Sequence, residues 1–232
     1  MTADHSTVRD PSSSGLGRLQ DFGRFYLNRR YRILFCALLF TMVASPLIAA
    51  FRMSGLLLES LLAVCLLAAV MPVHAGTHKT LLFTAMAFAW LARPLAAWLG
   101  HETLSLMTLA VWTLIGLLAA AMALRFAMRG ARVDAEHLFA ALSAYLLAGI
   151  YFGLLYWALE QGLPDMFNAS GLTRSAAIYF SFVTLATLGY GDIVPRTDVA
   201  RGLAIIEGVG GQLFLAVLVA RLVSLYATSA KD

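Results

Sequence analysis

A run of glycine and hydroxyl-bearing residues interrupts the apolar sequence near the C-terminus. Residues 184–192 read Thr-Leu-Ala-Thr-Leu-Gly-Tyr-Gly-Asp and lie between two long apolar stretches. Gly189 and Gly191 allow an extended, repeatedly turned backbone that side chains at both positions would obstruct. In such a path successive carbonyl oxygens can point the same way, and a ring of copies can replace the water around a dehydrated cation. The segment therefore predicts a cation site built from backbone oxygens.

The acid that follows the glycines fits the same chemistry. Asp192 would stand at the mouth of such a site, where a carboxylate raises the local cation concentration. The alternative is an ordinary Gly-Tyr-Gly-Asp turn that joins two spans. Thr184 and Thr187, with a short helical segment before them, favour the cation site over the turn.

The elements that must position this loop are a short helix and two spans. Residues 173–185 have the length of a helix without the length needed to cross a membrane, and Ser170 or Thr173 can cap the N-terminus of that helix. A re-entrant loop at membrane depth is tolerated only where it is buried in protein or lines a water-filled cavity. The C-terminal end of the helix would point toward the pore axis, where the negative end of its dipole favours a cation.

The sequence YFSFVTLATLGYGDIVP resembles the pore segment of bacterial potassium channels of the two-span type, and the similarity covers residues 137–226. Leu188 stands where that family more commonly has valine, and Ala186 where it frequently has threonine. Because Leu188 would contribute its carbonyl, the choice of cation is expected to survive the exchange. The resemblance implies that K+ is held by a selectivity filter, with an outer mouth and a supporting pore helix: Thr187, Leu188, Gly189, Tyr190 and Gly191 form the filter, Asp192 the mouth, and Thr184 the support. The Tyr190 ring is expected to point away from the axis and brace the filter.

Composition indicates an integral membrane protein. Hydrophobic residues make up 60% and charged residues 13% of the 232-residue chain, and a membrane-crossing helix needs about 20 apolar residues. The sequence predicts an all-α membrane protein in which a pore helix and filter loop re-enter between the fifth and sixth of six transmembrane helices. These helices are expected near 31–51, 55–73, 80–99, 103–124, 137–158 and 200–226.

The basic residues predict the orientation of these spans. The formal charge of +4 does not indicate nucleic acid, because the basic residues flank the apolar stretches. With a cytoplasmic N-terminus, twelve of the 17 Lys and Arg residues fall on the inner side. Both termini are then cytoplasmic, and the filter loop enters from the outside of a cell membrane. We expect three parts: residues 1–30 as a cytoplasmic segment that is disordered or carries an interfacial helix, 31–132 as a four-helix transmembrane domain, and 133–232 as the pore domain.

Four spans before a pore unit resemble the layout of voltage-gated channels. A voltage sensor needs several charges inside the field, each worth about 2.3 kcal/mol per 100 mV. The fourth span, residues 103–124, carries none. Arg125, Arg129 and Arg132 lie at or beyond its cytoplasmic end and are expected to anchor the span. The layout is therefore interpreted as voltage-gated-like without a charged sensor helix.

Glycines interrupt the sixth span. Gly208, Gly210 and Gly211 each cost about 1 kcal/mol in a helix relative to alanine. They indicate a hinge that opens a cytoplasmic gate, close packing against the pore helix, or both. Gly211 is the expected bend, because it follows Gly189 by 22 positions, where the family it resembles commonly has a hinge glycine.

Two further features of the sixth span bear on the gate and the filter. Leu218 and Leu222 lie below the glycines and are candidates for an apolar constriction that closes by excluding water. Glu207 is costly in a membrane unless it is paired or protonated. It is expected to brace the filter from behind.

The sequence thus predicts a potassium-selective channel that conducts passively through a lipid bilayer, with no cofactor beyond the permeant K+. A homotetramer is expected, because one chain supplies one quarter of the filter. A weakly selective cation channel and a non-conducting or regulatory channel subunit remain as alternatives. An alternating-access transporter is less consistent, since no internal repeat is visible. An enzyme is not expected, since no Ser/His/Asp or metal-ligand set has a credible spacing.

Overall fold

The computed structural model describes residues 29–44, 60–65, 84, 88, 92, 102–129, 134–169 and 171–229. The expected N-terminal segment and most of the expected second and third spans, 55–73 and 80–99, lie outside these residues. The described residues of those two spans are helical. Residues 29–44 are helical as well and include residues 31–44 of the expected first span, 31–51.

Helices account for the regular structure of the described residues, in which no strand is present. Four complete helices follow one another along the chain: α4 (Glu102–Met128), α5 (Ala135–Gly162), α6 (Arg174–Leu185) and α7 (Asp198–Ser229). Within the described part of the chain, three segments are long and apolar enough to cross a membrane: Thr103–Met128, Ala135–Gly162 and Asp198–Ser224. They coincide with the fourth, fifth and sixth expected spans.

Polar side chains fix where two of these helices begin. The Asp134 carboxylate accepts a hydrogen bond from the backbone N–H of His137 at the start of α5. The hydroxyl of Thr173 accepts one from the N–H of Ala176 at the start of α6. Both residues have the extended backbone of an N-cap and satisfy donors that the first helical turn leaves free. Of the two caps considered for the short helix, the structure uses Thr173.

Small residues bring α4, α5 and α6 together. A Cβ on Gly116 of α4 would lie 2.1 Å from the Tyr151 ring of α5. A Cβ on Gly153 of α5 would lie 2.5 Å from the Cα of Ile178 in α6, and one on Gly149 would lie 2.5 Å from the Phe182 ring. Gly149 and Gly153 are four residues apart and therefore share one helix face, which lets the two backbones approach closely.

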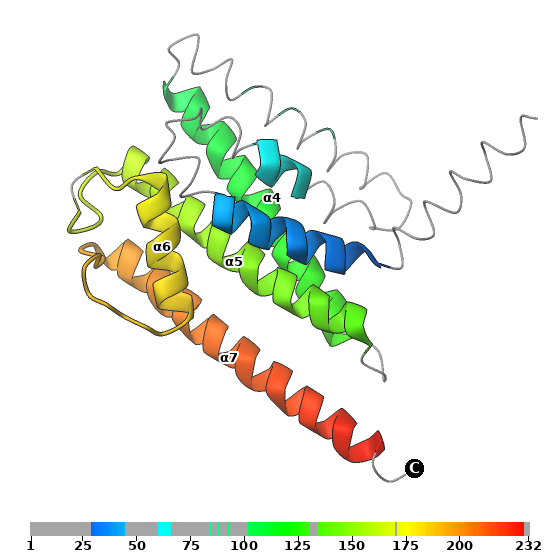
Figure 1. Cartoon of the computed structure of the whole chain (residues 1–232). Helices are drawn as coiled ribbons and strands as arrows, with labels where there is room; N and C mark the ends of the chain where they lie inside the picture. The colour runs from blue at the N-terminus through cyan, green and yellow to red at the C-terminus, as the bar shows by residue number, and fades with distance from the viewer. Residues whose placement is uncertain are drawn as a thin grey trace, which may run out of the picture.

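The short helix α6 lies at one side of the molecule, and a group of arginine contacts lies at the opposite side. Figure 1 shows α6 beside the C-terminal part of α5 and the N-terminal part of α7, while α7 runs on past the other helices. At the other side, Arg32 pairs with Glu136 across 3.0 Å, and Arg30 lies 4.8 Å from the centre of the Phe126 ring. Arg221 of α7 donates to the carbonyls of Ala127 and Arg129 at the same side.

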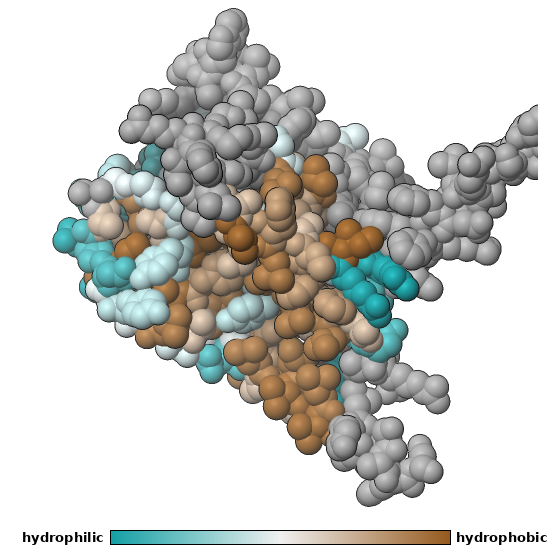
Figure 2. All heavy atoms as spheres, viewed as in Figure 1, coloured by the Kyte–Doolittle hydropathy of each residue, from teal (hydrophilic) through white to brown (hydrophobic). Residues whose placement is uncertain are grey.

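Much of α7 has no partner within the single chain. Only 11% of its apolar window is buried, against 61% for α5. Figure 2 shows apolar side chains spread over this exposed part, with polar residues gathered at the loop end of the molecule. Lipid or other protein subunits must cover this surface in a membrane.

Candidate functional site

The loop that follows α6 reverses the chain direction through backbone hydrogen bonds. The N–H groups of Ala186, Thr187 and Leu188 donate to the carbonyls of Phe182, Thr184 and Val183, respectively, at 2.9, 3.0 and 2.9 Å. These bonds use carbonyls that the end of a helix leaves without intrahelical partners. The loop therefore begins directly at the C-terminus of α6, as the sequence predicted for a pore helix and filter.

The loop backbone alternates in handedness. Thr187, Gly189 and Gly191 have positive φ angles of 55°, 60° and 80°, whereas Leu188 and Tyr190 between them do not. The sign of φ therefore alternates from residue to residue along the loop. Positive φ costs little at glycine but is uncommon at threonine. The backbone thus favours glycine at two of the three positions.

The side chains of the loop surround this backbone without burying it. Leu188 is 58% and Tyr190 67% exposed in the single chain. The Tyr190 ring is parallel to that of Tyr179 on α6, with ring centres 6.3 Å apart. The Nε2 atom of Gln212 in α7 lies 3.5 Å from the hydroxyl of Thr187 in the loop.

Asp192 at the far end of the loop is held from two directions. Its carboxylate accepts a hydrogen bond from the Tyr179 hydroxyl at 2.9 Å, and its backbone carbonyl accepts one from the Asn168 amide at 3.0 Å. The Asn168 side chain also accepts from the Val194 N–H at 2.8 Å. Tyr179 therefore contacts both Tyr190 and Asp192 and fixes the acid relative to the glycines.

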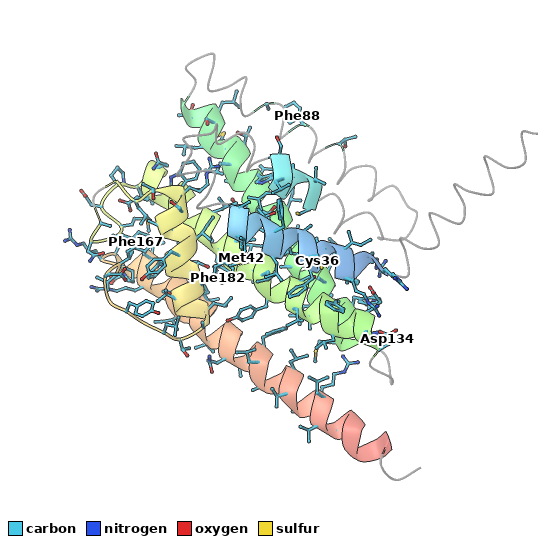
Figure 3. The ribbon with its side chains drawn as sticks, viewed as in Figure 1. Cys36, Met42, Phe88, Asp134, Phe167 and Phe182 are labelled. Carbon is cyan, nitrogen blue, oxygen red and sulfur yellow. The ribbon has the colours of Figure 1, made fainter. Side chains whose placement is uncertain are left out.

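The segment before α6 pairs with the residues that follow the loop. Residues 166–168 pair with residues 194–196 through backbone hydrogen bonds and an isolated bridge between Phe167 and Pro195. Phe167 also packs edge-on against Tyr156 and Phe180; Figure 3 labels it at this end of the molecule. Glu160 accepts hydrogen bonds from two backbone N–H groups in the turn that precedes this segment.

Glu207 joins three helices behind the loop. It is 1% exposed, and its carboxyl group contacts the Tyr156 hydroxyl of α5 at 2.8 Å and the Ser181 hydroxyl of α6. Ser181 also donates to the Gly149 carbonyl of α5 at 2.7 Å. In Figure 3, Phe182, the residue after Ser181, lies where α6 meets α5. The intramembrane acid noted in the sequence is thus connected to the pore helix through hydrogen bonds.

The glycines of α7 differ in what surrounds them. A Cβ on Gly211 would lie 2.8 Å from the carbonyl oxygen of Leu185, the last residue of α6. One on Gly208 would make an ordinary contact with Thr184, and one on Gly210 would meet nothing within 4 Å. Gly211 therefore packs closely against the end of α6, and α7 continues as one helix through all three positions.

The expected gate residues lie further along α7. Leu218 is partly buried against the core that α4 and α5 share, whereas Leu222 is 37% exposed. Between them and Glu207, a cavity of about 370 Å³ separates α7 from α4 and α5. Its lining is apolar except for Glu207 and Tyr145.

Several of these residues were missed by sequence reasoning. Tyr156, Asn168, Tyr179 and Ser181 are common residue types without a distinctive spacing, and no signal marked them. Gly149 and Gly153 did carry a signal, since two small residues four apart in an apolar span indicate a helix contact.

Comparison with known proteins concerns the part of the chain that contains this site. Residues 141–228 match the family model described as ion channel. A two-pore potassium channel c of Oryza sativa subsp. japonica is 41% identical over 91 residues, which are 38% of this chain and 18% of that protein. Residues 141–228 are therefore similar to an ion-channel family, and part of the chain is similar to a potassium channel.

A shorter segment of the chain is similar to a second potassium channel. A two-pore potassium channel 4 of Arabidopsis thaliana is 50% identical over 48 residues, which are 21% of this chain and 17% of that protein. The chain therefore spans less than a fifth of the length of these relatives. No solved structure matches it significantly.

Proposed function

We propose that the chain is one subunit of a homotetrameric, potassium-selective channel in a cell membrane. Residues 187–191 of each subunit form the selectivity filter, and Asp192 forms its outer mouth. The alternating sign of φ along residues 187–191 carries this proposal, because such a backbone can present successive carbonyls to one side of the chain. Four such strands around an axis give K+ the oxygen ligands that replace its water.

The surroundings of the loop support the same function. The C-terminus of α6 ends where the loop begins, so the negative end of the helix dipole lies at the base of the filter. Leu188 and Tyr190 are exposed, and so is much of α7, which leaves surface for neighbouring subunits. The basic residues Arg30, Arg125 and Arg221 lie at the opposite side from the loop, which agrees with both termini in the cytoplasm.

Opening is proposed to occur at the cytoplasmic side of α7. Bending at the glycine segment 208–211 would move Leu218 and Leu222 relative to the axis and open an apolar constriction. Thr184 and Glu207 support the filter, Thr184 through its backbone carbonyl to Thr187 and Glu207 through Ser181.

Potassium flux into liposomes that contain the purified chain tests the filter. Gly189→Ala places a side chain on a residue with φ of 60°, which strains the filter backbone and should abolish selective flux. Gly171→Ala is the matched control, because Gly171 has a φ of 71°, has nothing within 4 Å of its Cβ position and lies outside the filter. Equal flux in the two variants would contradict the filter assignment.

Reversal potentials in the same liposomes distinguish the alternatives. A potassium-to-sodium permeability ratio near one would favour a weakly selective cation channel over the proposed function. Absence of flux from correctly inserted protein would favour a non-conducting subunit.

A further inference from the structure

The hydrogen bonds around Glu207 can be counted proton by proton. Three oxygen–oxygen contacts connect four groups in a row: Tyr156 hydroxyl to Glu207 Oε2, Glu207 Oε1 to Ser181 Oγ, and Ser181 Oγ to the Gly149 carbonyl. Each contact needs one hydrogen. The two hydroxyls supply one hydrogen each, and the peptide carbonyl supplies none. The third hydrogen must therefore belong to the carboxyl group of Glu207.

An ionised Glu207 would leave this row one hydrogen short. Ser181 could then donate either to the carboxylate or to Gly149, and the other pair would be two acceptors in contact. Ser181 is fully buried and Glu207 is 1% exposed, so water cannot replace the missing partner. With the proton on the carboxyl, every group in the row has a partner.

The other groups that face Glu207 agree with a neutral acid. Helix α5 contributes Tyr156 and Tyr145, and α6 contributes Ser181. The α4 side chains that line the shared cavity are all apolar. Among the described residues, none of the ion pairs involves Glu207. An unpaired charge at this depth in a membrane would be costly.

Glu160 provides the contrast within the same chain. It is also buried, but both of its carboxylate oxygens accept from backbone N–H groups, those of Asp165 and Met166. These donors bring their own hydrogens, so the same count is complete with an ionised carboxylate. The two buried glutamates therefore differ in the number of protons their surroundings require.

We propose that Glu207 is a neutral carboxylic acid whose proton completes a hydrogen-bond chain from α7 through the pore helix α6 to α5. This proton positions Ser181 and, through α6, the loop that begins at Thr187. Loss of the proton at alkaline pH breaks the chain and lowers conduction. The effect on conduction rests on the proposed function, whereas the protonation state does not.

Infrared spectroscopy of the full-length chain in liposomes tests the proton directly. We expect a carbonyl stretch of a protonated carboxylic acid at neutral pH that disappears in Glu207→Gln and remains in Glu160→Gln. A spectrum in which Glu207→Gln removes no such band, or removes only a carboxylate band, would overturn the inference. This readout holds even for protein that conducts no potassium, in which case the proposed function fails and the inference is judged separately.

Potassium flux against pH tests the consequence. The amide of Glu207→Gln accepts from Tyr156 and donates to Ser181, so it preserves all three hydrogen bonds without a titrating proton. We expect near-native flux in this variant with no decline at alkaline pH, whereas wild-type flux declines. Glu207→Ala should lose flux by about tenfold or more at every pH, since it leaves buried polar groups unpaired. If Glu207→Gln loses as much flux as Glu207→Ala, or keeps the alkaline decline of the wild type, the positioning role of the proton is wrong.

Discussion

Replacing Gly211 by alanine separates the two roles considered for the glycines of α7. The new Cβ would lie 2.8 Å from both the carbonyl oxygen and the Cδ1 atom of Leu185, whereas ordinary contacts begin at 3.4 Å. The end of α6 or the backbone of α7 must therefore move by the difference of 0.6 Å. Overpacking of this kind costs about 1–3 kcal/mol, and the gain in helix propensity from alanine offsets about 1 kcal/mol of it.

The position of Leu185 gives this displacement a functional consequence. Leu185 precedes Thr187, the first residue of the proposed filter, by two positions. Its carbonyl belongs to the backbone, so no rotamer change can relieve that contact. We expect Gly211→Ala to lower both potassium flux and the thermal stability of the assembled protein. Gly210→Ala is the matched control, because its Cβ would meet nothing within 4 Å, and it should raise stability by about 1 kcal/mol.

Thermal unfolding measured beside flux decides between packing and hinge. If Gly211 served only as a hinge, Gly211→Ala would stiffen α7 and lower flux while stability stayed the same or rose. A loss of flux without loss of stability would therefore refute the packing argument. Equal stability changes in Gly211→Ala and Gly210→Ala would refute it as well.

Two further substitutions test contacts at the two ends of the pore domain. Tyr179→Phe keeps the ring stacked on Tyr190 but removes the hydrogen-bond donor to Asp192. We therefore expect reduced potassium flux from protein that assembles normally. Unchanged flux would show that flux does not depend on this hydrogen bond to Asp192. At the start of α5, hydrogen bonds from His137 hold the pKa of the Asp134 carboxyl below its usual value. The cap therefore contributes its full stability at pH values above the ordinary aspartate pKa. This contribution is lost as the pH falls through the lowered pKa of the folded protein. Asp134→Ala should cost about 1 kcal/mol at neutral pH and progressively less in acid, measured by thermal unfolding, and a difference that does not shrink in acid would contradict the assignment.

The short helix and its loop were predictable because their signals are local. The bounds of α6 follow from the Thr173 cap and from the apolar run that ends before the glycines, and the fourth to sixth spans follow from length and hydropathy. The positive φ angles at Gly189 and Gly191 follow from the residue type itself. None of these features requires knowledge of which helices touch.

The supports of the loop were not predictable for the opposite reason. Ser181 meets both Gly149 and Glu207 only because the face of α5 that carries Gly149 and Gly153 lies against α6. Helix length and hydropathy do not specify that rotation, since α5 is apolar on every side. The sequence indicates that an acid within a span needs a partner or a proton. Which partner it meets depends on this packing.

The contacts of α7 offer a route by which α4 could influence the proposed gate. Near its middle, α7 is held at Glu207 and Gly211, and closer to its C-terminus Arg221 donates to the carbonyls of Ala127 and Arg129 at the end of α4. These carbonyls have no intrahelical partners and carry the negative end of the α4 dipole.

Between the two points of attachment lies the cavity of about 370 Å³, although Phe214 and Leu218 of the joining segment pack against the core. Bending of α7 below Gly211 must therefore break or carry along the Arg221 bonds, and a hydrogen bond from a charged donor contributes about 1.5–3 kcal/mol. We therefore expect a displacement of the end of α4 to act on α7 through that contact. Arg221→Gln keeps a donor but removes the charge, so it should weaken the link and change the open probability measured at fixed voltage. An unchanged open probability would show that α4 does not act on the gate through Arg221.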